Sequence, residues 1–173
     1  MSSSNDEFRT FLPRVGRVKK SHPRVEAFGC VDELSCFVGL ARAVVGDEEV
    51  RDALKKVQDG LFHVGSYLAL LNHPLDRVAV VMEVLKELEN VMNARLQPLN
   101  RFIYPSGVYG ATLLHVCRAV ARRAERTVVR LGEVENVDPL VVSFLNYLSK
   151  FFFTAARYVN MKYGGVEEEW VSR

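Results

Sequence analysis

The chain has 173 residues, of which 49% are hydrophobic, and it carries a formal net charge of +2. This length and composition suit one globular domain that buries its own core, and so small a charge does not by itself indicate a polyanionic partner. The cysteines lack CxxC spacing and a matching histidine cluster, which excludes a disulfide framework and a zinc site. We interpret them as buried small hydrophobic residues: Cys30, Cys36 and Cys117.

The N-terminus, residues 1–6, is polar and lacks the apolar run of a signal peptide. No later stretch reaches the roughly 18 uncharged apolar residues that a membrane span requires, so the sequence predicts a cytoplasmic protein. We expect a polar and basic segment over residues 1–16, one helical domain over 17–165, and an acidic tail over 166–173 that ends in solvent.

Apolar residues recur at helical spacing in five successive segments. Asn72-His73-Pro74 separates the second from the third by only a short break, which implies neighbouring antiparallel helices. Asp138 and Pro139 are typical of the start of the last helix. No segment shows a convincing strand pattern, so the fold class is all-α, an up-and-down five-helix bundle. The five segments span about residues 21–46, 50–71, 78–97, 113–131 and 139–163.

The last predicted helix has apolar residues on two faces. A helix that needs cover on both sides lies either at the centre of a bundle or at a subunit contact. One stripe consists of Phe144, Leu148, Phe151 and Ala155, and a second, mixed stripe consists of Val142, Asn146, Ser149 and Phe153.

Charged residues lie beside the apolar stripe of the fourth predicted helix, at offsets of zero, three, seven and ten from His115. They form either a solvated basic face with ion pairs or an anion site, because arginines on a rigid helix suit phosphate oxygens. On the first helix, Asp32 has apolar neighbours, and such a carboxylate normally pairs with a cation.

The segment from Pro98 to Gly110 contains two prolines, two glycines and three aromatic residues between two helices. A loop of this length in a compact bundle is often functional. The alternative is a simple connection in which Phe102 and Ile103 pack into the core. The four histidines show no metal-binding spacing, so we predict no metal ligands.

Several phrases of the sequence stand in the order and at the spacing found in one known family. They read RVKK at 17–20, RVEAFGCVDEL at 24–34, FIYPSG at 102–107, LHVCRAVARRAER at 114–126, LNYLS at 145–149 and ARY at 156–158. Together they resemble the PduO-type ATP:cob(I)alamin adenosyltransferases. The resemblance implies a homotrimer of five-helix bundles with sites between subunits. It also implies ATP, Mg²⁺ and cob(I)alamin as substrates and cofactors, with no nucleic-acid or membrane partner.

In that family cob(I)alamin attacks C5′ of ATP and triphosphate leaves, so cations must receive the growing negative charge. By position, the resemblance implies an ion pair between Asp32 and Arg118 across the subunit boundary, which shapes the corrinoid side. It places Phe102 against the lower face of the corrin, where it excludes an axial ligand. The implied catalytic residues are Asp32, Phe102, Arg118 and Arg122, and the implied ATP-binding residues are Lys20, Arg122, Arg123, Glu125 and Asn146.

The sequence departs from the family pattern in two places. The glycine-rich TGDxGxT phrase, whose N–H groups can cradle phosphates, is not recognisable, and residues 8–16 read FRTFLPRVG. Tyr147 and Lys150 replace the Arg and Asp of the LNRLSD phrase. A non-catalytic corrinoid-binding or carrier relative is therefore the alternative function. Glu125 and the small net charge argue against a third class, nucleic-acid binding through the fourth helix.

Overall fold

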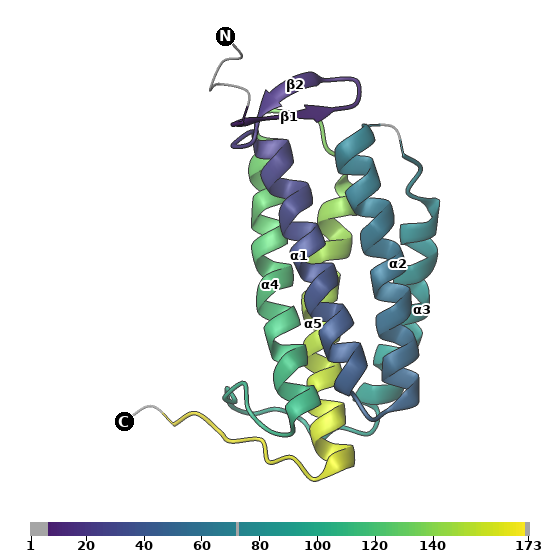
Figure 1. The fold of residues 1–173 in the computed structure, drawn as a ribbon. Coiled ribbons are helices and arrows are strands. Elements are labelled where there is room, and N and C mark those ends of the chain that lie inside the picture. The colour runs from purple at the N-terminus through teal and green to yellow at the C-terminus, as the bar shows by residue number, and fades with distance from the viewer. Residues whose placement is uncertain (1–6, 72, 172–173) are drawn as a thin grey trace.

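The computed structural model describes residues 7–71 and 73–171. Five helices lie side by side with their axes nearly aligned, and a small hairpin covers one end (Figure 1). The predicted five-helix bundle is therefore confirmed. In chain order the elements are β1 (Arg9–Leu12), β2 (Gly16–Lys19), α1 (Pro23–Val44), α2 (Glu48–Leu70), α3 (Asp76–Asn93), α4 (Tyr109–Gly132) and α5 (Pro139–Tyr163).

The hairpin shows that the expectation of a chain without strands is wrong. β1 and β2 pair antiparallel, with Arg9 opposite Lys19 and Leu12 opposite Gly16. Arg14 and Gly16 both have positive φ in the turn, at 68° and 91°. Each strand has only four residues and lies at the surface, so neither carries the long apolar alternation by which strands are recognised.

The predicted helix ends are set by their capping groups. The Asp47 side chain accepts a hydrogen bond from Val50 N at 3.0 Å at the start of α2, and Asp138 accepts one from Leu140 N at 2.8 Å at the start of α5. Gly164 ends α5 with φ of 73°, the left-handed conformation that glycine adopts without strain. Of the three cysteines, Cys30 and Cys117 are buried as predicted, whereas Cys36 is exposed on α1.

Helix α5 packs between its neighbours, as its two apolar faces require. It contacts α4 and α3 extensively and α2 at a few positions, and Phe144, Leu148 and Phe151 are fully buried. Among the described residues, α5 is the one helix long and apolar enough to cross a membrane, but 56% of its most apolar window is buried inside the bundle. Its apolar character is thus that of a core helix.

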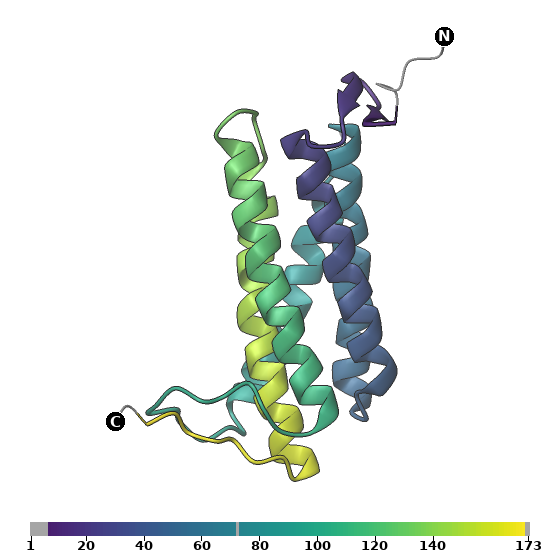
Figure 2. The same ribbon diagram turned by 60° about the vertical axis from the view of Figure 1, so that its left-hand side comes forward.

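The C-terminal segment does more than end in solvent. After α5 the chain turns back and runs along the segment between α3 and α4 (Figure 2). Ile103 and Glu169 form an antiparallel bridge, Tyr104 N donates to Glu168 O at 2.8 Å, and Trp170 N donates to Phe102 O at 2.7 Å. Backbone pairing therefore joins the tail to the loop that carries Phe102.

One buried cation links three parts of the bundle. Arg24, at the start of α1, is 1% exposed. Its Nη1 donates to Leu68 O near the end of α2 at 2.8 Å, and its Nε and Nη2 donate to Glu135 Oε2, between α4 and α5, at 2.9 and 2.5 Å. The arginine of the RVEAFG phrase thus has a structural role that spacing alone did not indicate.

We expect Arg24→Leu to lower the free energy of unfolding by about 3 kcal/mol, because the substitution leaves Glu135 and the Leu68 carbonyl without their buried partner. Urea unfolding measures this loss. The matched control is Arg77→Ala, which breaks an exposed pair with Asp59 and should cost less than about 1 kcal/mol. Equal losses in the two variants would contradict the role assigned to Arg24.

Candidate active site

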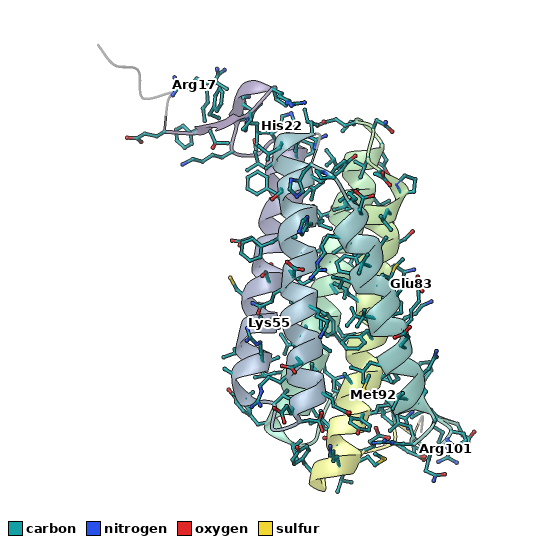
Figure 3. All side chains as sticks on the ribbon, turned by 90° about the vertical axis from the view of Figure 1, so that its right-hand side faces the viewer. Arg17, His22, Lys55, Glu83, Met92 and Arg101 are labelled. Carbon is teal, nitrogen blue, oxygen red and sulfur yellow. The ribbon has the colours of Figure 1, made fainter. Side chains whose placement is uncertain are left out.

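The residues implied in function occupy three separate regions of one chain. Lys20 follows the hairpin at one end of the bundle, and Phe102 lies in the loop at the opposite end. Figure 3 shows this separation through their labelled neighbours, with Arg17 and His22 at one end and Arg101 at the other. The remaining candidates lie along α1, α4 and α5 between these ends, so a single chain does not bring the whole set together.

Three cations gather where α4 packs on α5. A pocket of about 260 Å³ is lined by Arg118 and Arg122 of α4 and by Lys150 and Phe153 of α5. Among the described residues none of the three has an ion-pair partner. Burial, and then the charge of Arg122, lowers the pKa of Arg118. In the sequence, Lys150 stands out only because it replaces an Asp of the family pattern. The structure places its positive charge beside the two arginines.

His115 and Arg118 also line a second pocket, of about 500 Å³, on the α4 surface. His115 is 4% exposed, and neither ring nitrogen has a hydrogen-bond partner. Burial, with the charge of Arg118 as a smaller cause, lowers the pKa of His115 to about 4. The imidazole is therefore neutral at pH 7.

Arg123 differs from Arg122, the residue before it, in having a partner. Its Nη2 forms an ion pair with Glu33 of α1, so any phosphate group must compete with this carboxylate for Arg123. This ion pair runs between α4 and α1. The interpretation of α4 as a solvated basic face instead predicts ion pairs within one helix. Arg122 is exposed and has no such pair within the described chain.

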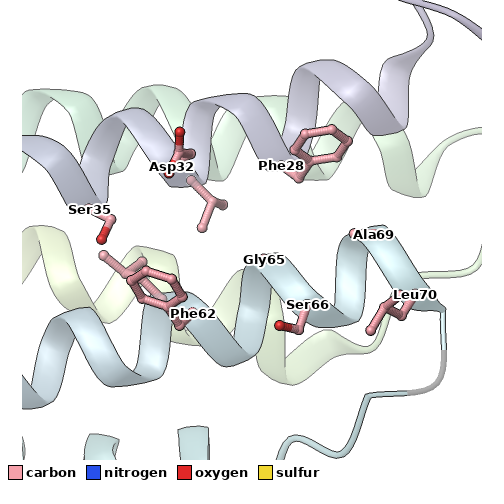
Figure 4. A pocket seen from close by; sticks show the side chains of 10 residues that line it. Phe28, Asp32, Ser35, Phe62, Gly65, Ser66, Ala69 and Leu70 are labelled. Atoms are coloured by element: carbon pink, nitrogen blue, oxygen red, sulfur yellow. The ribbon is translucent and has the colours of Figure 1, made fainter. Parts of the chain in front are cut away.

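Asp32 is exposed on α1 and lines a different pocket from Arg118. With Phe28, Phe62 and Leu70 it lines a largely apolar pocket of about 330 Å³ between α1 and α2 (Figure 4). The expectation that it pairs with a cation is not met within this chain, because no ion pair involves Asp32 in the part of the chain that the structure describes. Arg118 and Asp32 therefore remain apart in a single subunit.

Phe102 is 79% exposed, so the alternative in which it packs into the core is wrong. Its ring meets that of Trp170 edge-on, with the centroids 6.5 Å apart. A pocket of about 380 Å³ lies beside the two rings and is also lined by Asn100 and Arg101. The loop thus presents an aromatic side chain to the surroundings rather than to its own core.

The other three implied ATP-binding residues lie on different elements. Lys20 is exposed after β2, where its backbone N donates to Phe8 O at 2.8 Å. Glu125 is half-buried on α4, and Asn146 is exposed on α5, one turn before Lys150. Neither Lys20 nor Glu125 forms an ion pair within residues 7–71 and 73–171.

No group of three or more His, Cys, Asp or Glu side chains that could hold a metal ion occurs among the described residues. The closest approach of two histidines is that of His63 and His73, whose Nδ1 and Nε2 lie 2.9 Å apart between α2 and the segment before α3. A divalent cation would therefore need most of its ligands from elsewhere, such as the oxygens of a bound phosphate chain.

Comparison with known proteins relates this arrangement to characterised enzymes. A family model described as cobalamin adenosyltransferase matches residues 2–159. A corrinoid adenosyltransferase of Bacillus subtilis is 39% identical over 156 residues, which are 86% of this chain and 80% of the relative. The corrinoid adenosyltransferase PduO of Salmonella typhimurium is 37% identical over 160 residues, 89% of this chain and 47% of the relative.

Solved structures agree with these relatives. A variant of the PduO-type ATP:co(I)rrinoid adenosyltransferase from Lactobacillus reuteri, complexed with ATP, superposes with a TM-score of 0.89 at 29% identity, covering 99% of both chains. A second variant from the same organism, complexed with cobalamin and ATP, superposes with a TM-score of 0.86 at 29% identity, again over 99% of both chains.

We expect the buried His115 to make the protein less stable as the pH falls from 7 to 5. The unfolded chain takes up a proton near the ordinary histidine pKa of about 6.5, whereas the folded chain does so only near 4, so protonation favours unfolding in this window. The contribution is about 2 kcal/mol at pH 5. Urea unfolding of wild type and His115→Leu at both pH values tests it: the variant should lose less stability on acidification, and parallel losses would contradict the assignment.

Proposed function

Because the chain belongs to the cobalamin adenosyltransferase family, we propose that it transfers the 5′-deoxyadenosyl group of ATP to a cob(I)alamin-type corrinoid. The electron pair of Co(I) attacks C5′ of ATP and the cobalt–carbon bond forms. The C5′–O bond breaks, and triphosphate leaves with its electron pair. No proton transfer is needed, so the protein's task is to orient two substrates and to stabilise the charge of the leaving group.

The observation that carries this proposal is the cluster of Arg118, Arg122 and Lys150. These three cations stand on two packed helices, line one pocket and lack ion-pair partners among the described residues. Holding like charges together without carboxylates costs free energy. In the assembly proposed below, Asp32 of a second subunit would pair with Arg118, and a polyanionic ligand would offset the cost of the other two cations. Cations placed beforehand on packed helices can also stabilise the charge that develops on the triphosphate.

We assign the remaining nucleotide contacts to four residues outside this cluster, of which Lys20 lies at the hairpin end of the chain. Lys20 and Arg123 are further cations for the phosphate chain, and Glu125 and Asn146 supply hydrogen-bonding groups for the nucleoside. Mg²⁺ fits this arrangement as an ion carried on the ATP phosphates, since the described residues hold no group of three metal-binding side chains. We also propose that the protein is cytoplasmic.

We propose a homotrimer in which each site lies between two subunits. The candidate residues lie on two different surfaces of one chain: Asp32 beside the apolar α1–α2 pocket, and Arg118 on α4. Contact between two unlike surfaces is heterologous, and such contacts close into a ring when the rotation permits. Charge complementarity supports this geometry, because an unpaired carboxylate on one surface would meet an unpaired arginine on the other.

Phe102 completes the proposed site from the corrinoid side. It is an exposed aromatic ring on a loop that is paired to the tail, and an apolar ring against the lower face of the corrin would keep axial ligands from cobalt. Loss of the axial ligand lowers the electron density at Co(II) and favours its reduction to the nucleophilic Co(I) state. The residue would thus assist reduction rather than the transfer step.

The test of the function is anaerobic incubation of the protein with cob(I)alamin, ATP and Mg²⁺, followed by detection of adenosylcobalamin and triphosphate. We expect both products. In a parallel assay, Phe102→Ala should slow the reaction that starts from Co(II) by about tenfold or more, with a smaller effect when Co(I) is supplied directly. Tightly bound corrinoid without product would favour the carrier alternative. Equal losses in the two assays would show that Phe102 does not keep an axial ligand from cobalt.

We expect Asp32 and Arg118 to be energetically coupled across the subunit contact. Asp32→Asn leaves the partner's guanidinium desolvated without a counter-charge, which commonly costs about 3 kcal/mol for a buried pair. The double variant Asp32→Asn with Arg118→Met should then be little worse than either single variant in trimer stability, measured by sedimentation, and in corrinoid affinity. Effects that add within about 0.5 kcal/mol would show that the two residues are independent.

A further inference from the structure

Asn160 is a buried amide near the C-terminal end of α5. It is 1% exposed, and its hydrogen bonds go to backbone groups of the loop before α4. Its Oδ1 accepts from Val108 N at 3.0 Å, and its Nδ2 donates to Ser106 O at 3.0 Å. Its backbone carbonyl accepts from Gly165 N at 2.8 Å. One residue therefore binds the end of the loop and the turn that begins the tail.

Arg157 makes the corresponding contacts one helical turn earlier. It is 8% exposed, and its Nη2 donates to Gln97 O, at the start of the loop, at 2.9 Å. Its Nε donates to Glu167 Oε1, in the tail, at 2.9 Å. Arg157 and Asn160 therefore hold both ends of the loop and both ends of the turn that leads from α5 into the tail.

The segments they hold form one structure, which we call the loop–tail unit: residues 97–108 and 165–170. Between the two anchors, the backbone bonds of Phe102 with Trp170 and of Tyr104 with Glu168 pair the segments. Arg101 and Glu169 add an exposed ion pair at 3.2 Å. Phe102 lies near the middle of the loop, away from both anchors, so its place depends on how firmly the ends are fixed.

Two glycines permit this close approach. Gly107 has φ of 117°, and a β-carbon added there would overlap the Asn160 amide. A β-carbon on Gly165 would overlap the same amide. A side chain at either position would therefore push the loop or the tail away from Asn160.

We infer that Arg157 and Asn160 are positioning residues that hold the loop–tail unit on α5 and thereby keep Phe102 extended toward the corrinoid. The inference rests on the proposed function for the role of Phe102, but the clamp itself is defined by the contacts above. A buried amide must satisfy both its donor and its acceptor, and here both partners belong to one surface loop, so the amide ties that loop to α5. Neither residue touches a substrate in this account; both act through Phe102.

The experiment uses a reporter that the chain already contains, since Trp170 is its single tryptophan and lies in the loop–tail unit. Asn160→Ala removes both side-chain hydrogen bonds from the helix side, and Gly107→Ala disturbs the same contact from the loop side. The matched control is Gly164→Ala, which places alanine at a positive φ of 73° but meets no atom within 4 Å. Thermal unfolding followed by circular dichroism confirms that each variant retains its helices.

Two readouts are compared across the variants. In the free protein, acrylamide should quench Trp170 fluorescence more strongly in Asn160→Ala and Gly107→Ala than in wild type or Gly164→Ala. In the adenosylation assay, the Co(II)-started rate should fall by about tenfold to a hundredfold, the scale of loss for a displacement of about 1 Å, and the Co(I)-started rate should fall much less. Gly164→Ala should change neither readout.

The outcomes separate the inference from the proposed function. Unchanged quenching in both variants would overturn the clamp, as would equal losses in the Co(II)-started and Co(I)-started rates, which a general loss of structure produces. If Asn160→Ala does not fold, Gly107→Ala alone decides, since it leaves α5 intact. A wild type that forms no adenosylcorrinoid would reject the proposed function, whereas the quenching result would still decide whether Asn160 holds the loop–tail unit.

Discussion

The structure depends on burying both apolar faces of α5 against neighbouring helices. Its aromatic and aliphatic residues need partners all round, and burying each large apolar side chain contributes about 1.5–3 kcal/mol. Helices α3 and α4 supply that cover, and several polar residues of α5 reach groups outside the apolar core. Lys150 reaches the pocket beside α4, while Arg157 and Asn160 turn toward backbone groups of the loop and tail. The core helix thereby supports both ends of the proposed site.

Besides the exposed ion pairs at the surface, the described residues include two kinds of ionic group. Arg24 pairs with Glu135, 111 residues away, and Arg157 pairs with Glu167 in the tail, ten residues away; both arginines are buried. Asp32, Arg118 and Arg122 lie on the faces of α1 and α4 without partners among the described residues. Buried charges that are paired fix the fold, whereas unpaired charges on rigid helices remain available to a second subunit or a polyanionic substrate. This division separates Arg24 and Arg157 from Arg118 and Arg122, whereas Arg123 belongs to neither kind because it pairs with Glu33 at the surface.

The sequence by itself determined the helices and the family. Apolar spacing and capping residues such as Asp138 and Gly164 are local signals, because each depends on neighbours within one or two turns. The observed bounds of α5 follow them closely, whereas α4 begins four residues before its predicted start and α3 ends four residues before its predicted end. The phrases that carry the family resemblance are likewise contiguous. The hairpin escaped prediction because its four-residue strands are too short and too exposed to show a period. The two alternatives for the loop, functional or merely connecting, could not be separated without knowing where Phe102 points.

Only the tertiary structure decided which polar residues belong together. Spacing along α4 could not show that Lys150 joins Arg118 and Arg122, since that contact depends on how α5 rotates against α4. It could not show that Arg123 has a partner in Glu33, 90 residues away, or that Asn160 anchors a loop 52 residues before it. Local periodicity specifies which face of a helix is apolar, but the partner of a charge or an amide is set by packing between elements, and no local pattern records it.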